Sequence, residues 1–121
     1  MKRILIVEDK ASSRELLRTV LENQGYAVTE AADGEEALIK ARGEGPDLIL
    51  LDLQMPTRSG YEVLKELRRE PRFAAVPIVA VTASAMQGDR ERALAAGFNS
   101  YLTKPLSLSS LRSEIQRLLP G

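Results

Sequence analysis

The 121-residue sequence contains no cysteine and no histidine. The lack of cysteine excludes disulfides and thiolate metal sites, and it fits a reducing compartment. The lack of histidine excludes a histidine-based catalytic triad, an imidazole general base and a histidine-ligated zinc site. Any chemistry must therefore use carboxylates, hydroxyls, lysine side chains and the backbone.

The sequence also lacks an excess of either charge, with 17 basic and 17 acidic residues. This balance gives no strong electrostatic field that would indicate a nucleic-acid or membrane partner. No apolar run approaches the length of about 18 residues that a membrane span requires, and no signal peptide is evident. We expect a soluble cytoplasmic protein that forms one domain over residues 1–121, without a separate output domain.

Short apolar runs alternate along the chain with segments of helical periodicity. Such alternation predicts an α/β fold, in which parallel crossovers leave a sheet covered by helices on both faces. We expect a single doubly wound, flavodoxin-like parallel sheet, and we adopt for it the known strand order 2-1-3-4-5. Strands are expected over 4–7, 26–31, 48–51, 78–81 and 98–102, and five helices over 12–24, 34–42, 61–70, within 84–96, and over 107–119.

Two segments match helix N-terminal patterns. Ser12 to Glu15 fits a capping box with Ser12 as the N-cap, and Asp33 to Glu36 repeats that pattern. The fourth helix is expected to carry Met86 and to end at Gly97.

Polar side chains follow most of the predicted strands. Leu48 to Leu51 is a wholly apolar run that suits a strand buried on both faces, and it ends at Asp52. Because parallel strands end at the same edge of a sheet, polar residues that follow different strands should lie together beyond that edge. The residues expected there are Glu8, Asp9, Asp52, Thr82 and Lys104.

The predicted group of acids favours a bound cation. Two carboxylates about 5 Å apart repel by roughly 3 kcal/mol at an effective dielectric constant near 20, and three carboxylates form three such pairs. Lys104 alone cannot neutralise them, so either one carboxylate is protonated or a cation lies among them. Oxygen ligands favour Mg²⁺, with Mn²⁺ as a substitute. A carboxylate nucleophile beside Mg²⁺, a lysine and a hydroxyl is suited to phosphoryl transfer onto Asp52.

Each of these residues also has a simpler interpretation. Glu8 and Asp9 can form a solvated turn, Thr82 can cap the following helix, and Lys104 can be an exposed loop charge. Tyr101 can serve packing alone.

Four motifs in the same chain resemble the receiver domain of two-component response regulators. They are Glu8-Asp9, Asp52 to Pro56 with Gly60, Val81-Thr82-Ala83, and Lys104-Pro105. The resemblance extends from about residue 2 to residue 119. The segment from Ala83 to Asp89 is similar to that of stand-alone regulators of the DivK type and of receivers in hybrid histidine kinases.

The resemblance implies roles for individual residues. Asp52 would accept the phosphoryl group from the phosphohistidine of a histidine kinase or phosphotransfer protein. Asp9 and Asp52 would bind Mg²⁺ directly, Gln54 through its backbone carbonyl, and Glu8 through water. Lys104 would contact the phosphate, and the Lys104–Pro105 bond would be cis. Thr82 and Tyr101 would be the switch residues.

The expected output is a phosphorylation-dependent change in the affinity for a downstream protein partner at the face of helix 4, strand 5 and helix 5. Two other classes of function stay open. A phosphatase of the dehalogenase type needs a second acid two residues after the nucleophile, where Gln54 stands. The other is an interaction module that ignores phosphate.

Overall fold

The structure, a computed structural model, describes residues 1–56, 58–84 and 86–120. Within these ranges five strands form one sheet, and every neighbouring pair is parallel. The strand order β2-β1-β3-β4-β5 confirms the predicted doubly wound topology. The elements are β1 (Arg3–Val7), α1 (Ala11–Asn23), β2 (Ala27–Ala31), α2 (Gly34–Glu44), β3 (Leu48–Asp52), α3 (Gly60–Arg68), a 3₁₀ turn (Pro71–Phe73), β4 (Ile78–Thr82), α4 (Asp89–Ala96), β5 (Ser100–Thr103) and α5 (Leu108–Leu118).

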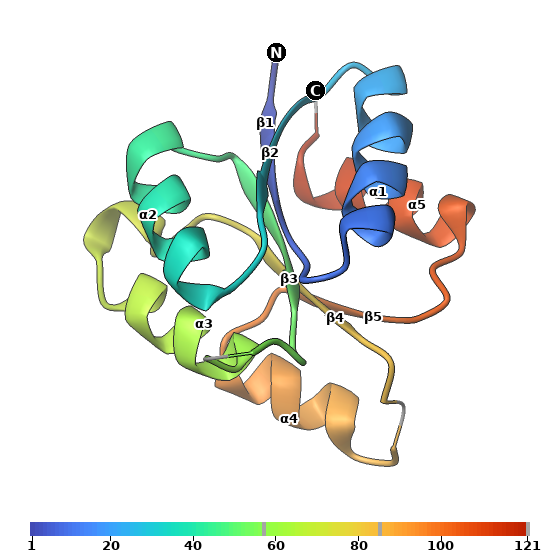
Figure 1. The fold of residues 1–121 in the computed structure, drawn as a ribbon. Coiled ribbons are helices and arrows are strands. Elements are labelled where there is room, and N and C mark those ends of the chain that lie inside the picture. The colour runs from blue at the N-terminus through green and yellow to red at the C-terminus, as the bar shows by residue number, and fades with distance from the viewer. Residues whose placement is uncertain (57, 85, 121) are drawn as a thin grey trace.

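Helices cover both faces of the sheet. Helices α1 and α5 lie on one face, while α2, α3 and α4 lie on the other (Figure 1). Successive side chains of a strand point to opposite faces, so Ile4 and Ile6 join the core under α1 and α5, and Leu5 and Val7 join the other core. The central strand β3 is buried along its whole length, as its apolar run predicts.

The predicted cap of α2 is confirmed. The Asp33 side chain accepts a hydrogen bond from the Glu36 backbone N–H at 2.8 Å. The Glu36 carboxylate in turn accepts from the Ala32 backbone N–H. The helix is therefore closed at its start by two side chains, as in a capping box.

The predicted capping box of α1 is wrong. The helix begins at Ala11, and its N-cap is Lys10, which makes no side-chain cap hydrogen bond. The Arg14 N–H already donates to the Lys10 carbonyl, and the Glu8 carboxylate accepts from the Lys10 N–H. The acid that ends the first strand thus organises the start of the helix, which leaves no capping role for Ser12.

The start of α4 also differs from the prediction. The helix begins at Asp89, so Met86 precedes it and is 73% exposed. Gly88 has a φ of 87°, which interrupts any right-handed helix there. The Asp89 carboxylate accepts hydrogen bonds from the Ser84 hydroxyl and the Met86 N–H, and Gln87 and Gly88 form a turn before the helix. Ala85 lies outside the described residues.

The last strand is shifted from its predicted position. β5 starts at Ser100, because the Phe98 N–H donates to the Ala93 carbonyl and closes the end of α4. The last helix begins at Leu108, one residue after its predicted start, because Ser107 is its N-cap and accepts a hydrogen bond from the Ser110 N–H. In the part of the chain that the structure describes, no helix combines the length and apolar character that a membrane crossing needs.

Candidate functional site

The polar residues predicted to meet do lie at one edge of the sheet, beyond the carboxyl ends of the strands. Glu8 follows β1, Asp52 is the last residue of β3, and Thr82 is the last residue of β4. Lys104 follows β5 and reaches back across β4 to the acids. The order of the strands explains this convergence, because β1 and β3 are neighbours at the point where strand order reverses.

Glu8, Asp9 and Asp52 form one acidic group. Each supplies a carboxylate oxygen, and these oxygens lie within 4.8 Å of one another. Glu8 and Asp52 are 2% and 3% exposed, whereas Asp9 faces solvent. At such a separation each pair of charges repels by roughly 3 kcal/mol at an effective dielectric constant near 20. Hard oxygen donors, close together and partly open to water, fit a divalent cation such as Mg²⁺.

The side chain of Lys104 bridges the two buried acids. Its Nζ donates to Glu8 Oε1 at 2.5 Å and to Asp52 Oδ2 at 2.8 Å. The Lys104 side chain is 27% exposed, so its ammonium group is less buried than the two carboxylates it contacts. The Lys104–Pro105 peptide bond is cis. The Lys104 backbone N–H donates to the Thr82 carbonyl, which continues the pairing of β4 with β5 up to the pocket.

Burial and hydrogen bonding act in opposite directions on these three groups. Burial raises the pKa of Asp52, and the hydrogen bonds from Lys104 and the Gln54 N–H offset this only in part. Burial also acts to raise the pKa of Glu8, but hydrogen bonds from Lys104 and the Lys10 N–H outweigh it and lower that pKa. Burial acts to lower the pKa of Lys104, yet its two carboxylate partners raise it. Because its pKa is raised, Lys104 stays charged at neutral pH.

The loop after β3 holds Asp52 in place. The Gln54 N–H donates to Asp52 Oδ1 at 2.8 Å, and the Gln54 side chain accepts from the Ala83 N–H at 3.3 Å. Gln54 therefore connects the loop after β3 to the loop after β4. The role of its backbone carbonyl as a metal ligand stays a prediction.

Thr82 and Tyr101 meet through Ser84. The Thr82 hydroxyl accepts from the Ser84 N–H at 3.0 Å, and the Tyr101 hydroxyl donates to the Ser84 carbonyl at 2.8 Å. Both side chains also line a hollow of about 190 Å³ beside Gln54. Thr82 does not cap α4, because that helix begins seven residues later, at Asp89. The sequence carries no sign of this bridging position of Ser84, because the contacts use its backbone N–H and carbonyl, which other residue types also supply.

Arg14 on α1 also contacts the site. Its guanidinium group donates to the backbone carbonyls of Glu8 and Asp9, directly behind the acidic group. In the sequence, Arg14 falls on the polar face expected of an amphipathic helix, where arginine is common. The sequence therefore does not predict its contact with the two carbonyls.

Fold and site together define a class of protein: a CheY-like flavodoxin fold with an acidic pocket, a lysine and a threonine at the carboxyl edge of its sheet. The family description "Response regulator receiver domain" matches residues 4–116. The chain belongs to this family and is a receiver domain of two-component signalling.

Individual relatives agree over the whole chain. The polar-differentiation response regulator DivK of Brucella anthropi is 41% identical over 118 residues, which cover 98% of this chain and 96% of that protein. The structure of the Vibrio cholerae chemotaxis protein CheY4 superposes with a TM-score of 0.92 at 34% identity, covering 98% and 99% of the two chains. The receiver domain of a Pseudomonas aeruginosa sensor histidine kinase gives a TM-score of 0.90 at 39% identity, covering 99% and 98%. That structure holds a magnesium ion in its active-site cleft.

Proposed function

We propose that this receiver domain is a phosphorylation-dependent switch in which Asp52 is the phosphoryl acceptor. The observation that carries the proposal is the position of Asp52. It lies at the end of the central strand, within 4.8 Å of two further acids, and it is hydrogen-bonded to Lys104. Receiver domains interact with histidine kinases and phosphotransfer proteins, and the phosphohistidine of such a partner is the proposed donor.

The acidic group is the proposed Mg²⁺ site. Asp9 and Asp52 would hold the ion directly, with the Gln54 backbone carbonyl as a third protein ligand and Glu8 acting through water. Mn²⁺ would substitute for it, since oxygen ligands also suit that ion. When bound, the cation supplies positive charge that offsets the repulsion among the carboxylates and the negative charge of the phosphoryl group. The magnesium ion in the cleft of the Pseudomonas aeruginosa receiver supports this assignment.

The chain's own residues perform the transfer. An oxygen of the ionised Asp52 carboxylate attacks phosphorus, the P–N bond to the donor imidazole breaks, and its electron pair stays on the imidazole nitrogen. No general base is needed, because the nucleophile carries no proton. The Lys104 ammonium group and the Thr82 hydroxyl donate hydrogen bonds to the phosphoryl oxygens, which lowers the energy of their charge.

The proposed output follows from the contacts of Thr82. When the Thr82 hydroxyl donates to the phosphoryl group, its hydrogen bond from the Ser84 N–H would be lost or rearranged. The Ser84 backbone would then shift, and its carbonyl would no longer be placed to accept from the Tyr101 hydroxyl. Phosphorylation would thereby shift the population of two arrangements of the face formed by α4, β5 and α5. That face would bind a downstream protein partner in the cytoplasm, with no direct contact to nucleic acid.

A hydrolase with external substrates is not favoured. Such chemistry at Asp52 requires an acid two residues later to protonate the leaving group, and Gln54 cannot donate that proton. Its amide oxygen instead accepts a hydrogen bond from the Ala83 N–H.

Incubation with acetyl phosphate and Mg²⁺, followed by intact-mass measurement, tests the proposal. The wild type is expected to gain one phosphoryl group, and Asp52→Asn none. Asp47→Asn is the matched control, because Asp47 lies just before the same strand, where its carboxylate accepts from the Arg3 N–H. It should be labelled like the wild type. Equal labelling of Asp52→Asn and the wild type would reject Asp52 as the acceptor.

A further inference from the structure

Arg14 holds the connection between β1 and α1 in place by hydrogen bonds to its backbone. Its Nη1 donates to the Glu8 carbonyl at 2.8 Å and to the Asp9 carbonyl at 3.3 Å. The same guanidinium group donates to Glu30, so it lies between the connection and β2. One side chain thus hydrogen-bonds the backbone carbonyls of both Glu8 and Asp9, which are two of the three acids in the group.

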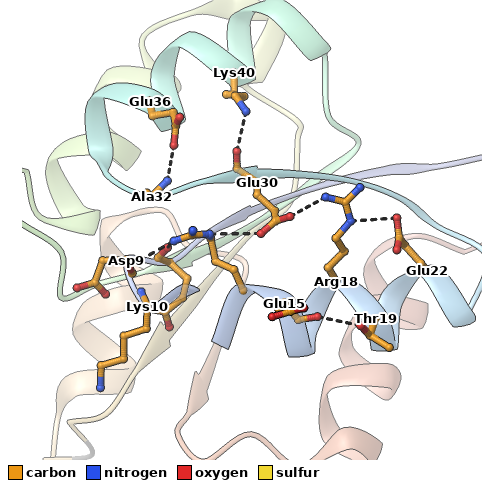
Figure 2. Close-up of polar contacts among 12 residues, drawn as sticks. Asp9, Lys10, Glu15, Arg18, Thr19, Glu22, Glu30, Ala32, Glu36 and Lys40 are labelled. Carbon is orange, nitrogen blue, oxygen red and sulfur yellow. Dashed lines mark hydrogen bonds and ion pairs between the residues drawn. The ribbon is translucent and has the colours of Figure 1, made fainter. Parts of the chain in front are cut away.

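The other side of Arg14 is anchored to the edge strand β2. Its Nε donates to Glu30 Oε1 at 3.3 Å. Figure 2 shows the neighbouring contact, in which Arg18 Nη1 donates to Glu30 Oε2 at 2.6 Å. The Glu30 carbonyl accepts from Lys40 Nζ at 2.9 Å. Glu30 pairs in register with Ile6 of β1, so it belongs to the same sheet as the acids. The Arg14 side chain is 19% exposed, which limits its freedom to leave this arrangement.

Hydrogen bonds to this backbone matter because little else fixes the position of the Asp9 carboxylate. Asp9 faces solvent, so packing does not fix its carboxylate, and its position depends on its backbone. The three carboxylates also repel one another, which favours a connection that opens away from β3. The planar fork of arginine bonds the Glu30 carboxylate with one edge and the carbonyls with another, and an ammonium group cannot reproduce that geometry.

We propose that Arg14, anchored by Glu30, is a positioning residue that sets the Glu8–Asp9 backbone for Mg²⁺ binding. This inference rests on the proposed metal site. Partners behind metal ligands orient them, and their substitution commonly costs 10- to 100-fold in metal affinity. The edge strand β2 and the helix α1 thereby contribute to a site whose ligands they do not supply.

The test compares Arg14→Lys with Arg18→Lys. Both variants keep the positive charge, so a change in long-range electrostatics does not explain a difference between them. Both weaken a contact to Glu30, but Arg18 reaches neither the Glu8 nor the Asp9 carbonyl. Mg²⁺ affinity is measured by isothermal titration calorimetry on the full chain, and thermal unfolding without metal reports any loss of stability.

Arg14→Lys is expected to bind Mg²⁺ about tenfold more weakly, whereas Arg18→Lys binds it like the wild type. Glu30→Gln, which removes the anchor but leaves Arg14 in place, should also weaken binding, and it serves if Arg14→Lys does not fold. Wild-type affinity in the folded Arg14→Lys or Glu30→Gln variant, or an equal loss in Arg18→Lys, would overturn the inference. If the wild type itself binds no Mg²⁺, the proposed metal site fails instead.

Discussion

At the scale of single residues, the site depends on the hydrogen bonds that Lys104 makes to two carboxylates at once. Its ammonium group contacts both Glu8 and Asp52, which are almost completely buried. These contacts help to lower the pKa of Glu8 and offset part of the rise that burial causes in the pKa of Asp52. Asp9 adds a third negative charge within 4.8 Å. The pocket therefore carries more negative than positive charge before any cation binds, and this imbalance is the physical basis for the proposed affinity for Mg²⁺.

Asp9→Asn should show two separate effects of the Asp9 charge, namely its destabilisation of the metal-free protein and its contribution to Mg²⁺ binding. The substitution keeps both contacts of Lys104 and removes one repelling charge. The metal-free protein should become more stable, by about 1 kcal/mol because Asp9 is exposed and its interactions are screened. Mg²⁺ at a hundredfold excess over its Kd should stabilise the wild type by about 3 kcal/mol and the variant far less. Urea unfolding with and without Mg²⁺ measures both effects.

Glu15→Gln is the control for this experiment, because it removes one acidic charge from an exposed position on α1. It should leave the stabilisation by Mg²⁺ unchanged. An Asp9→Asn protein that gains as much stability from Mg²⁺ as the wild type would remove Asp9 from the metal site.

The residues of the site were predictable to the extent that they follow strands. Asp52, Thr82 and Lys104 lie where the end of an apolar run and the parallel topology put them. The contacts made by Arg14 and Ser84 were not predictable, because they involve backbone carbonyls and a loop path that the sequence pattern does not encode.

At the scale of elements, the site requires α3 to start very close to the end of β3. A Cβ atom on Gly60 would lie 2.8 Å from the Asp52 carbonyl oxygen and 2.9 Å from the Leu53 Cα. The Gly60 N–H also donates to the Leu53 carbonyl at 3.2 Å. Any side chain here must push the helix away from the residue next to the proposed acceptor.

Gly60→Ala should therefore destabilise the protein by about 1–3 kcal/mol, the usual cost of forcing extra atoms into a packed site. Gly43→Ala is the matched control, because Gly43 lies within α2 and a Cβ atom there would meet nothing within 4 Å. Since alanine favours helix, this control should be neutral or stabilising by up to about 1 kcal/mol. Chemical denaturation compares the two. Equal stabilities of Gly60→Ala and the wild type would show that the approach of α3 to β3 is not tight.

Helix starts show where local sequence patterns fail. Asp33 caps α2 as predicted, because its partners Glu36 and Ala32 lie within a few residues of it. Ser12 does not cap α1, since the Glu8 carboxylate, which belongs to the pocket, already bonds the Lys10 N–H. At the start of α1, a residue of the functional site thus takes the place that the local sequence pattern assigned to Ser12.

At the scale of the whole molecule, the sheet separates two apolar cores, and the acidic group lies at the edge formed by the carboxyl ends of the strands. Figure 1 shows α1 and α5 on one face of the sheet and α2, α3 and α4 on the other. The apolar side chains of β1 and β3 belong alternately to the core on one face and to the core on the other. The fold class was predictable from a different pattern, the alternation of short apolar runs with segments of helical periodicity along the chain. The known strand order then brought the acids together, and the 2-1-3-4-5 order is what makes β1 and β3 neighbours.

The central claim is that one pocket serves one reactive carboxylate, and locating the phosphoryl group tests it most directly. Borohydride reduces an acyl phosphate to an alcohol, so a phosphorylated aspartate is converted to homoserine and marked permanently. After treatment with acetyl phosphate and Mg²⁺, then borohydride, peptide mass spectrometry should find that conversion at Asp52 and not at Glu8 or Asp9. Conversion at another carboxylate, or none in a protein that has gained a phosphoryl group, would contradict the account.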